Sequence, residues 1–362
     1  MKQLKVVQIT ETFATGVYTY LKDLSDVLDE IEGIDNTIIY SGKRKGTPQN
    51  TITKSTRLIQ LYMSNEISII KDIKSSFNLY RLLLGINPDI IHVHSSKAGF
   101  IGRLVSIFLG KNLKILYTPH GFSFLRKDIP KTKQKLFFFI ERFISLISKS
   151  TIIACGDTEL EYAKKLSKRV YLIRNGINFN GLPTYMDHAP NDRLTIGILS
   201  RITYARNPEF FNQIALEFPE FDFLWIGDGE LRNEITAPNI KVTGWFTEKQ
   251  DGYDNLKRLD IYLQTSLWEG LPISVLEAMA LRKPVIASNV IGNKDAVKHG
   301  VTGFLYNDFS EACSYLKMLA NDKDLRLSLG KEGYELSKLK FDVNENFRKL
   351  ADYYFESLEP GK

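Results

Sequence analysis

Short apolar segments alternate with helical patterns along most of the chain, and this alternation constrains the fold more than any other feature of the sequence. In the first half, β-branched runs at residues 6–9 and 89–93 lie on either side of helical spacing at residues 17–28. The second half begins the scheme again, with a strand pattern at residues 194–199 and a helical pattern at residues 208–218. Such alternation predicts an α/β fold in which parallel sheets carry helices on both faces.

Other segments fit the same alternation. Further strands are predicted at residues 113–118, 151–154, 222–226, 240–242, 260–263, 284–287 and 304–306. Further helices are predicted at residues 66–84, 98–109, 132–147, 274–281, 309–319 and 341–358.

The length of 362 residues suits two domains of ordinary size. Residues 180–193 contain a glycine and two prolines, a composition typical of a linker. We therefore predict two doubly wound Rossmann-like domains, residues 1–186 and residues 187–340, that face each other across a cleft. The aromatic-rich C-terminal segment, residues 341–362, is expected to form a helix that packs back on the first domain.

Composition excludes several classes of protein. With 43% hydrophobic and 25% charged residues, the chain is neither disordered nor fibrous. Its two cysteines, Cys155 and Cys313, cannot make a disulfide framework or a four-ligand zinc site. The first ten residues lack the cleavage site of a signal peptide, and no run of 18 apolar residues predicts a membrane span. We therefore expect an intracellular, cytoplasmic protein.

Charge is divided unequally between the two halves. Residues 1–186 contain 27 Lys and Arg against 15 Asp and Glu, whereas the remaining residues contain 21 against 27. The net charge of +6 thus combines a basic half with an acidic half. Such asymmetry points to an anionic partner for the basic half, either a lipid surface or nucleic acid, although a solvated basic face explains the charge equally simply.

Two glutamates flank a predicted helix start in the second half. Glu269 lies in a turn beside Gly270 and Pro272, and Glu277 lies about one turn inside the helix that follows. The free N–H groups and the positive end of the helix dipole make such a start an anion site. Carboxylates accept hydrogen bonds from sugar hydroxyls, so the two acids could hold the two ends of an elongated anionic ligand. Ordinary helix-start acids are the alternative.

Two arginines follow the first predicted strand of the same half. Arg201 and Arg206 lie at the carboxyl end of the strand at residues 194–199, the edge where parallel sheets bind ligands. Two guanidinium groups there could clamp a diphosphate and stabilise its departure. Alone, the pair could equally be ordinary surface arginines.

These motifs together carry a family resemblance. The run EGLPISVLEAMA at residues 269–280, with KPVIAS at 283–288 and GVTGF at 300–304, resembles the signature of retaining glycosyltransferases of family 4, which have the GT-B fold. Arg201 and Arg206 match the positions of that family's Arg and Lys, so Arg206 differs in residue type but keeps the charge. The resemblance covers nearly the whole chain and is looser in the first half.

The resemblance implies a role for each of these residues. Glu277 is expected to hold the ribose hydroxyls of a nucleotide sugar, and Glu269 to contact the donor sugar near its anomeric centre. Arg201 and Arg206 are expected to bind the diphosphate. The other donor-binding residues of this half, where backbone groups support the distal phosphate, are expected to be Leu271, Pro272, Ile273, Ser274 and Val275.

The first half adds two expected donor contacts. His120, in the segment TPHGF after a predicted strand, resembles the family's donor-contacting histidine. A surface histidine in a turn is the alternative. Gly16 occupies the place of the family's Gly-rich turn, of which it is the only glycine here.

The implied chemistry is a retaining transfer through an oxocarbenium-like state. No residue is assigned as a carboxylate nucleophile, and the family's proposed mechanism is front-face attack, in which the departing phosphate takes the proton of the acceptor. Arg201 and Arg206 would stabilise that phosphate as charge develops. Neither a metal nor another cofactor is therefore expected.

A basic stretch leads into an aromatic-rich helical pattern at residues 131–147. Lys131, Lys133 and Lys135 precede Phe137 and Phe138, a combination that suits an anionic membrane surface. A core helix with an exposed first turn is the alternative. Resemblance to family members that build bacterial surface polysaccharide on lipid-diphosphate carriers favours the membrane. Nucleic acid is not expected as a partner, because no recognised binding motif accompanies the charge.

The sequence therefore predicts a glycosyltransferase that moves a sugar from a nucleoside-diphosphate sugar, UDP being the family's commonest choice, to a polyprenyl-diphosphate-linked saccharide. We expect it to act in capsule or surface polysaccharide synthesis, at the inner face of the cell membrane. One alternative is a sugar-nucleotide 2-epimerase of the same fold, although such enzymes lack the EGLP arrangement. Another is a non-catalytic membrane-binding scaffold.

Overall fold

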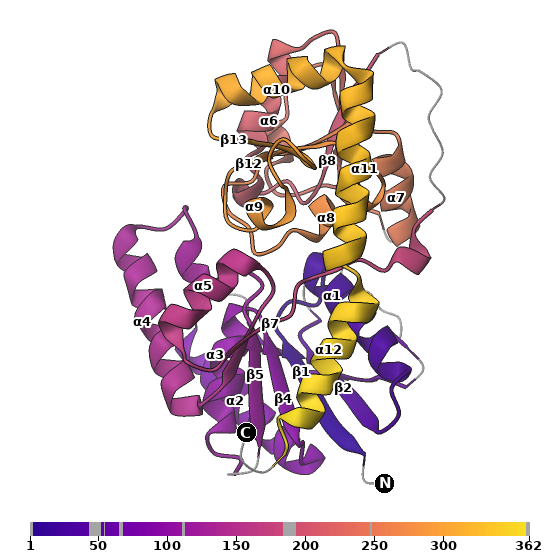
Figure 1. Ribbon diagram of the computed structural model, residues 1–362. Helices are drawn as coiled ribbons and strands as arrows, with labels where there is room; N and C mark the ends of the chain where they lie inside the picture. Colours follow the sequence, from indigo (N-terminus) through magenta and orange to yellow (C-terminus); the bar gives the residue numbers. More distant parts are fainter. Residues whose placement is uncertain are drawn as a thin grey trace. The chain divides into compact units, whose positions relative to one another are not determined.

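The computed structural model describes residues 3–42, 52–53, 55–64, 68–110, 113–183, 193–246 and 248–359. It contains two compact units. The first unit comprises Met1–Asn175 with Val343–Lys362, and the second comprises Gly176–Asp342. Figure 1 shows a parallel sheet with its covering helices in each of them.

Seven parallel strands form the sheet of the first unit, in the order β3-β2-β1-β4-β5-β6-β7. The strands are β1 (Leu4–Thr10), β2 (Ile34–Tyr40), β3 (Arg57–Gln60), β4 (Ile90–His94), β5 (Lys114–Thr118), β6 (Thr151–Ala154) and β7 (Val170–Leu172). The helices are α1 (Thr15–Asp29), α2 (Ile69–Ile86), α3 (Ser96–Ser106), η1 (Ser123–Leu125), α4 (Lys131–Ser148), α5 (Asp157–Leu166) and α12 (Val343–Glu356).

The helices of the first unit cover both faces of its sheet. Right-handed crossovers place α2 to α5 on one face and α1 on the other, and α2, α3, α4 and α5 pack against one another in that order. Between this helix layer and the sheet lies the apolar core, which includes Ile9, Ile91, Val93 and Tyr117. Buried on both faces, β4 is apolar or histidine throughout, which is why its sequence does not alternate.

Six parallel strands form the sheet of the second unit, in the order β10-β9-β8-β11-β12-β13. The strands are β8 (Thr195–Leu199), β9 (Asp222–Ile226), β10 (Ile240–Val242), β11 (Ile261–Gln264), β12 (Val285–Ser288) and β13 (Gly303–Tyr306). The helices are η2 (Phe179–Gly181), η3 (Tyr204–Arg206), α6 (Pro208–Glu217), η4 (Arg232–Glu234), α7 (Lys249–Lys257), α8 (Ile273–Ala280), α9 (Asn293–Ala296), α10 (Phe309–Asn321) and α11 (Lys323–Lys340).

The chain returns to the first unit at its C-terminus, where α12 packs against α1 (Figure 1). The predicted helix at residues 341–358 starts two residues too early, because Phe341 ends α11 instead. Its N–H bonds to the carbonyl of Ser337 and its own carbonyl accepts from Ile177, both in the second unit. The two units separate between Asn175 and Gly176, whereas the predicted boundary after residue 186 lies outside the described residues.

Candidate active site

Ligand chemistry in a parallel sheet is expected at the edge where the strands end. In the second unit, η3 follows β8, a glycine turn follows β9, and the loop to α8 follows β11. Parallel pairing of these neighbouring strands brings all three connections to one edge. The turn after β9 lies close to the β8 loop, because a Cβ on Gly227, at φ +127°, would come within 2.3 Å of the Ser200 carbonyl oxygen.

Glu269 is the centre of this edge. Its side chain is only 6% exposed. Three groups contact its Oε1 atom: Arg206 Nη1 pairs with it at 2.9 Å, and Gln264 Nε2 and Ser266 Oγ donate to it at 2.8 Å and 2.7 Å. Gln264 is itself oriented by the hydroxyl of Tyr262, which donates to its Oε1 at 3.0 Å. No described residue bonds to Glu269 Oε2, so one oxygen of a firmly held carboxylate is left for a hydroxyl donor.

The two loops that carry Arg206 and Glu269 are joined to each other. Thr265 Oγ1 donates to the carbonyl oxygen of Arg206 at 2.6 Å. The N–H of Leu267 donates to the carbonyl oxygen of Ala205 at 2.8 Å. From the β12 side, Gly292 approaches so closely that a Cβ there would lie 2.8 Å from that of Glu269. The structure therefore brings together Arg206 and Glu269, for which the sequence predicts separate roles in the site.

The start of α8 has the expected form of an anion site. Pro272 is its N-cap, the helix begins at Ile273, and no side chain caps it. The first N–H groups of an α-helix have no intrahelical acceptor, and their dipole favours negative charge. Leu271, Pro272 and Val275 are buried, while Ile273 and Ser274 are half-buried. The least buried residues of this start are thus Ile273 and Ser274.

Glu277 lies in the second turn of α8 and is 6% exposed. The ammonium group of Lys249, in the first turn of α7, lies 3.9 Å from its Oε1. Beside α7, Trp245 and Phe246 help to line a hollow of about 390 Å³ just beyond the end of β10. Sequence reasoning missed Lys249 and this hollow, although the exposed aromatic pair directly after a predicted strand was a usable signal.

Arg201 does not join the Arg206–Glu269 pair. It follows β8 directly, but its guanidinium bonds to Glu230 at 3.2 Å and its side chain is 37% exposed. Of the two arginines in the predicted clamp, Arg206 is therefore paired with Glu269. Arg201 is held by a surface acid in the turn after β9.

In the first unit, His120 follows β5 in a left-handed conformation with φ +52°. Its ring packs against Tyr20 of α1, with ring centroids 4.7 Å apart, and its Nε2 lies 3.1 Å from Nδ1 of His94. Burial lowers the pKa of His120 to about 3, so the ring is neutral at physiological pH. Gly16 lies exposed in the first turn of α1, just beyond the carboxyl end of β1.

The structure corrects the prediction for α4. Lys131, Lys133 and Lys135 are exposed, but Phe137 and Phe138 pack against the core instead of facing outward. Phe138 lies edge-on to Phe124, with ring centroids 5.3 Å apart. The outward row of α4 is formed by Leu136, Phe139, Phe143, Leu146 and Ile147, each at least 38% exposed. The helical phase was misassigned, because three consecutive phenylalanines leave the buried face ambiguous.

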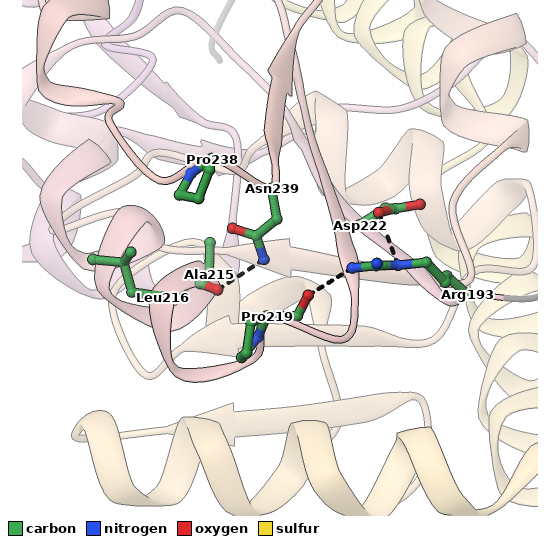
Figure 2. Close-up of a pocket in the computed structure, with 7 residues that line it drawn as sticks. All are labelled: Arg193, Ala215, Leu216, Pro219, Asp222, Pro238 and Asn239. Carbon is green, nitrogen blue, oxygen red and sulfur yellow. Dashed lines mark hydrogen bonds and ion pairs between the residues drawn. The ribbon is translucent and has the colours of Figure 1, made fainter.

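A hollow of about 320 Å³ lies elsewhere on the second unit (Figure 2). Its residues Arg193, Asp222 and Asn239 stand at the beginnings of β8, β9 and β10, so it lies at the opposite edge of the sheet. Arg193 bonds to Asp222 and to the carbonyl of Pro219, and Asn239 bonds to that of Ala215 (Figure 2). These groups satisfy one another, and the hollow is a structural feature of the loops.

Among the described residues, no three His, Cys, Asp or Glu side chains are grouped so that they could hold a metal ion. Likewise, none of the described helices combines the length and the apolar character that crossing a bilayer requires.

Comparison with known proteins agrees with this architecture. The family model described as Glycosyltransferase Family 4 matches residues 14–180, and the one described as Glycosyl transferases group 1 matches residues 194–322. The UDP-Gal:alpha-D-GlcNAc-diphosphoundecaprenol alpha-1,3-galactosyltransferase of Escherichia coli is 28% identical over 325 residues, 82% of this chain and 82% of that protein. The capsular polysaccharide biosynthesis glycosyltransferase CapM of Staphylococcus aureus is 25% identical over 322 residues, 81% and 83% of the respective chains.

Solved structures share the fold at lower identity. Sucrose-phosphate synthase from Thermosynechococcus elongatus has a TM-score of 0.86 at 17% identity, covering 98% of this chain and 99% of that one. Anabaena Alr3699/HepE, solved in complex with UDP and glucose, has a TM-score of 0.77 at 16% identity, covering 98% and 100%. The chain therefore belongs to the glycosyltransferases of the GT-B fold, with a family 4 domain in its first half and a group 1 domain in its second.

Proposed function

We propose that the protein is a retaining glycosyltransferase that moves a sugar from a nucleoside-diphosphate sugar, with UDP as the preferred nucleotide, to a polyprenyl-diphosphate-linked saccharide. The observation that carries the proposal is the Arg206–Glu269 pair beside the uncapped start of α8. The relative from E. coli acts, by its name, on a diphosphoundecaprenol-linked GlcNAc, and CapM acts in capsular polysaccharide biosynthesis. These names support a place in capsule or surface polysaccharide synthesis.

The donor is held mainly by the second unit in this proposal. Glu277 accepts hydrogen bonds from the ribose hydroxyls, and the free N–H groups at Ile273 and Ser274 receive the distal phosphate. Glu269 uses Oε2, which no described residue engages, for a hydroxyl of the donor sugar. The hollow beside Trp245 is of a size and aromatic character that suit the nucleobase.

The chemical step needs stabilisation of the leaving diphosphate more than it needs a base. Arg206 is pre-positioned at the sheet edge by Glu269, and its charge offsets the negative charge that develops as the glycosidic bond breaks. Arg201 joins it by exchanging Glu230 for phosphate oxygens. The departing phosphate takes the acceptor's proton at the same face, which retains the anomeric configuration. From the first unit, His120 and Gly16 contact the donor sugar.

A donor-binding experiment tests this assignment. UDP added to the intact protein is expected to raise its melting temperature by mass action, and Glu277→Ala to remove that increase because the ribose hydroxyls lose their acceptor. Glu335→Ala, an exposed acid on α11, serves as the matched control and keeps the increase. A Glu277→Ala variant stabilised by UDP as well as the wild type would refute the donor site.

The products distinguish transfer from the alternatives. A radiolabelled UDP-sugar and a polyprenyl-diphosphate saccharide are expected to yield labelled lipid, with the donor's anomeric configuration kept. Conversion of the nucleotide sugar to its 2-epimer without an acceptor would identify an epimerase instead. Neither product in the presence of tight UDP binding would leave a non-catalytic scaffold.

The acceptor's lipid carrier requires a membrane-facing surface, and we place it on the outer side of α2, α3 and α4. These adjacent helices and the turn after α3 expose twelve large apolar side chains: Ile70, Ile73, Phe77, Leu84, Phe100, Ile107, Phe108, Leu136, Phe139, Phe143, Leu146 and Ile147. Apolar patches of this extent mark interaction sites. We call these residues the apolar face.

Charge supports an anionic bilayer as the proposed partner of the apolar face. The exposed basic residues of these helices are Lys71, Lys74, Arg81, Lys131, Lys133, Lys135 and Arg142. Their acids are both neutralised within the described structure: Asp72 pairs with Lys97 at 2.8 Å, and Glu141 is buried against Arg103. Cations around apolar side chains suit lipid headgroups and acyl chains respectively.

Vesicle sedimentation tests the apolar face. Phe139→Ser with Phe143→Ser is expected to weaken binding to phosphatidylglycerol vesicles at least tenfold, because two half-exposed aromatic side chains lose their insertion. A triple variant with Glu in place of Lys131, Lys133 and Lys135 should weaken binding to anionic vesicles as strongly. Its binding to uncharged vesicles should not weaken. Leu339→Ser, an 81% exposed apolar residue on α11, is the control that leaves binding unchanged. Sedimentation of either variant with vesicles as strongly as the wild type would contradict membrane docking. Variants that lose a dimer but still bind vesicles would contradict it too.

A further inference from the structure

A chain of buried side chains links the C-terminal helix to His120. His94 lies between Gln8 and His120: its Nε2 is 2.8 Å from Gln8 Oε1, and its Nδ1 is 3.1 Å from His120 Nε2. Gln8 Nε2 donates at 3.2 Å to the hydroxyl of Tyr354 on α12. The strands β1, β4 and β5 and the helix α12 therefore share one hydrogen-bonded network in the first unit.

The other branch of the network begins at Tyr354. Its hydroxyl accepts the amide proton of Gln8, so its own proton points to His92 Nδ1 at 2.7 Å. His92 Nε2 then donates to Thr118 Oγ1 at 2.8 Å. Gln8, His92, His94 and Tyr354 are fully buried, so water does not compete for these bonds.

The direction of each bond fixes the position of each proton. Burial lowers the pKa of His94 and His120, so each ring is neutral and carries one proton. Gln8 Oε1 can only accept, which puts the proton of His94 on Nε2 and leaves its Nδ1 as an acceptor. His120 must then carry its proton on Nε2, and its Nδ1 keeps a free lone pair. No described residue bonds to that Nδ1.

The amide of Gln8 sets this polarity. With the amide reversed, every bond of the network would reverse too, and His120 would present an N–H at Nδ1 instead of a lone pair. In the observed orientation, the Tyr354 hydroxyl accepts from Gln8 Nε2 on the α12 side. Ring packing holds His120 itself, because Tyr20 lies edge-on against it and Phe347 of α12 packs on Tyr20 at 4.9 Å.

We propose that Gln8, His94 and Tyr354 are positioning residues that present His120 as a neutral imidazole whose Nδ1 accepts a hydrogen bond from a sugar hydroxyl. This inference rests on the proposed function for the identity of the ligand. It assigns the C-terminal helix a role in the site, because its Tyr354 hydroxyl is the hydrogen-bond partner of the amide on which the tautomer of His120 depends.

Nitrogen NMR tests the tautomer without any assumption about activity. The chain has five histidines, so the ring nitrogens of the ¹⁵N-histidine-labelled protein can be assigned by removing them one at a time. At neutral pH, His120 is expected to show a protonated Nε2 and an unprotonated Nδ1, and Gln8→Met to mix the two tautomers. A His120 protonated at Nδ1, or as an imidazolium, would overturn the proposal.

Kinetics test whether the tautomer matters for transfer. Gln8→Met is expected to lower kcat/KM about tenfold, the worth of one ligand hydrogen bond. In a His120→Ala background the same change is expected to have no further effect, because Gln8 acts only through His120. Equal losses in both backgrounds would show a merely structural role. If His120→Ala retains full activity while the NMR result holds, the ligand role of His120 fails and the network stands.

Discussion

Arg206→Ala is expected to lower kcat for sugar transfer by about 100- to 1,000-fold, the usual effect of removing one group that stabilises a developing anion. The guanidinium is already held at the sheet edge by Glu269, at 2.9 Å, and its own carbonyl is held by Thr265. It therefore needs no reorganisation to meet a diphosphate. Initial rates at saturating donor measure the effect, since a loss in kcat reports on the transition state.

Matched arginines make this experiment specific. Arg206→Lys keeps the charge but loses the fork that Glu269 and a phosphate can share, so an intermediate rate is expected. Arg232→Ala removes an exposed arginine that pairs with Asp228 in the neighbouring turn, and should leave kcat unchanged. Arg201→Ala reports whether the second arginine leaves Glu230 for the diphosphate. Normal turnover by Arg206→Ala would exclude the leaving-group role.

Glu141→Leu is expected to destabilise the first unit by about 3–5 kcal/mol, because it leaves a buried arginine without its counter-charge. Arg103 is fully buried and donates to Glu141 Oε2 at 2.6 Å, to Ser145 Oγ at 3.0 Å and to the carbonyl of Gly99 at 2.7 Å. Its guanidinium also lies 3.9 Å from the ring centroid of Tyr117. This cluster fastens α3 to α4, two of the three helices that carry the apolar face.

The distribution of tryptophan allows the two units to be followed separately. All three tryptophans, Trp225, Trp245 and Trp268, lie in the second unit. In urea denaturation of Glu141→Leu, the unfolding transition of the first unit, followed by circular dichroism, should therefore shift to a lower urea concentration. The transition followed by tryptophan fluorescence should stay in place. The double variant Arg103→Met with Glu141→Leu should recover much of the loss, since no charge is then stranded. A single variant as stable as the wild type would refute the buried ion pair.

Periodicity predicted the fold because most of the strands are buried on both faces. Every strand proposed from a β-branched run, including β4, β9 and β12, is present in the structure. The strands β2, β3 and β7 were not predicted; in β2 the apolar run is only three residues long, Ile38–Tyr40, after a polar stretch. α11 was also missed, because its long charged residues and two glycines weaken the apolar period that marks a helix.

The site could be predicted only as far as residue type and strand position carry information. Arg206 and Glu269 were singled out because each follows a strand of the same sheet, and parallel pairing brings such positions to one edge. Lys249 near Glu277 and the partners of His120 were not predicted. Those contacts depend on where α7 and α12 pack, and packing between distant segments leaves no local pattern in the sequence.

The return of α12 to the first unit has a consequence for how the protein is made. Helix α12 is synthesised after the whole of the second unit, yet it supplies Phe347, Leu350 and Tyr354 to the interior of a unit whose other residues end at Asn175. The second unit, continuous in sequence, can finish folding first. Until α12 has been synthesised, the imidazole of His92 and the amide of Gln8 lack the hydroxyl that joins them. A chain interrupted before α12 therefore exposes an incomplete first unit, even when its second unit has already folded.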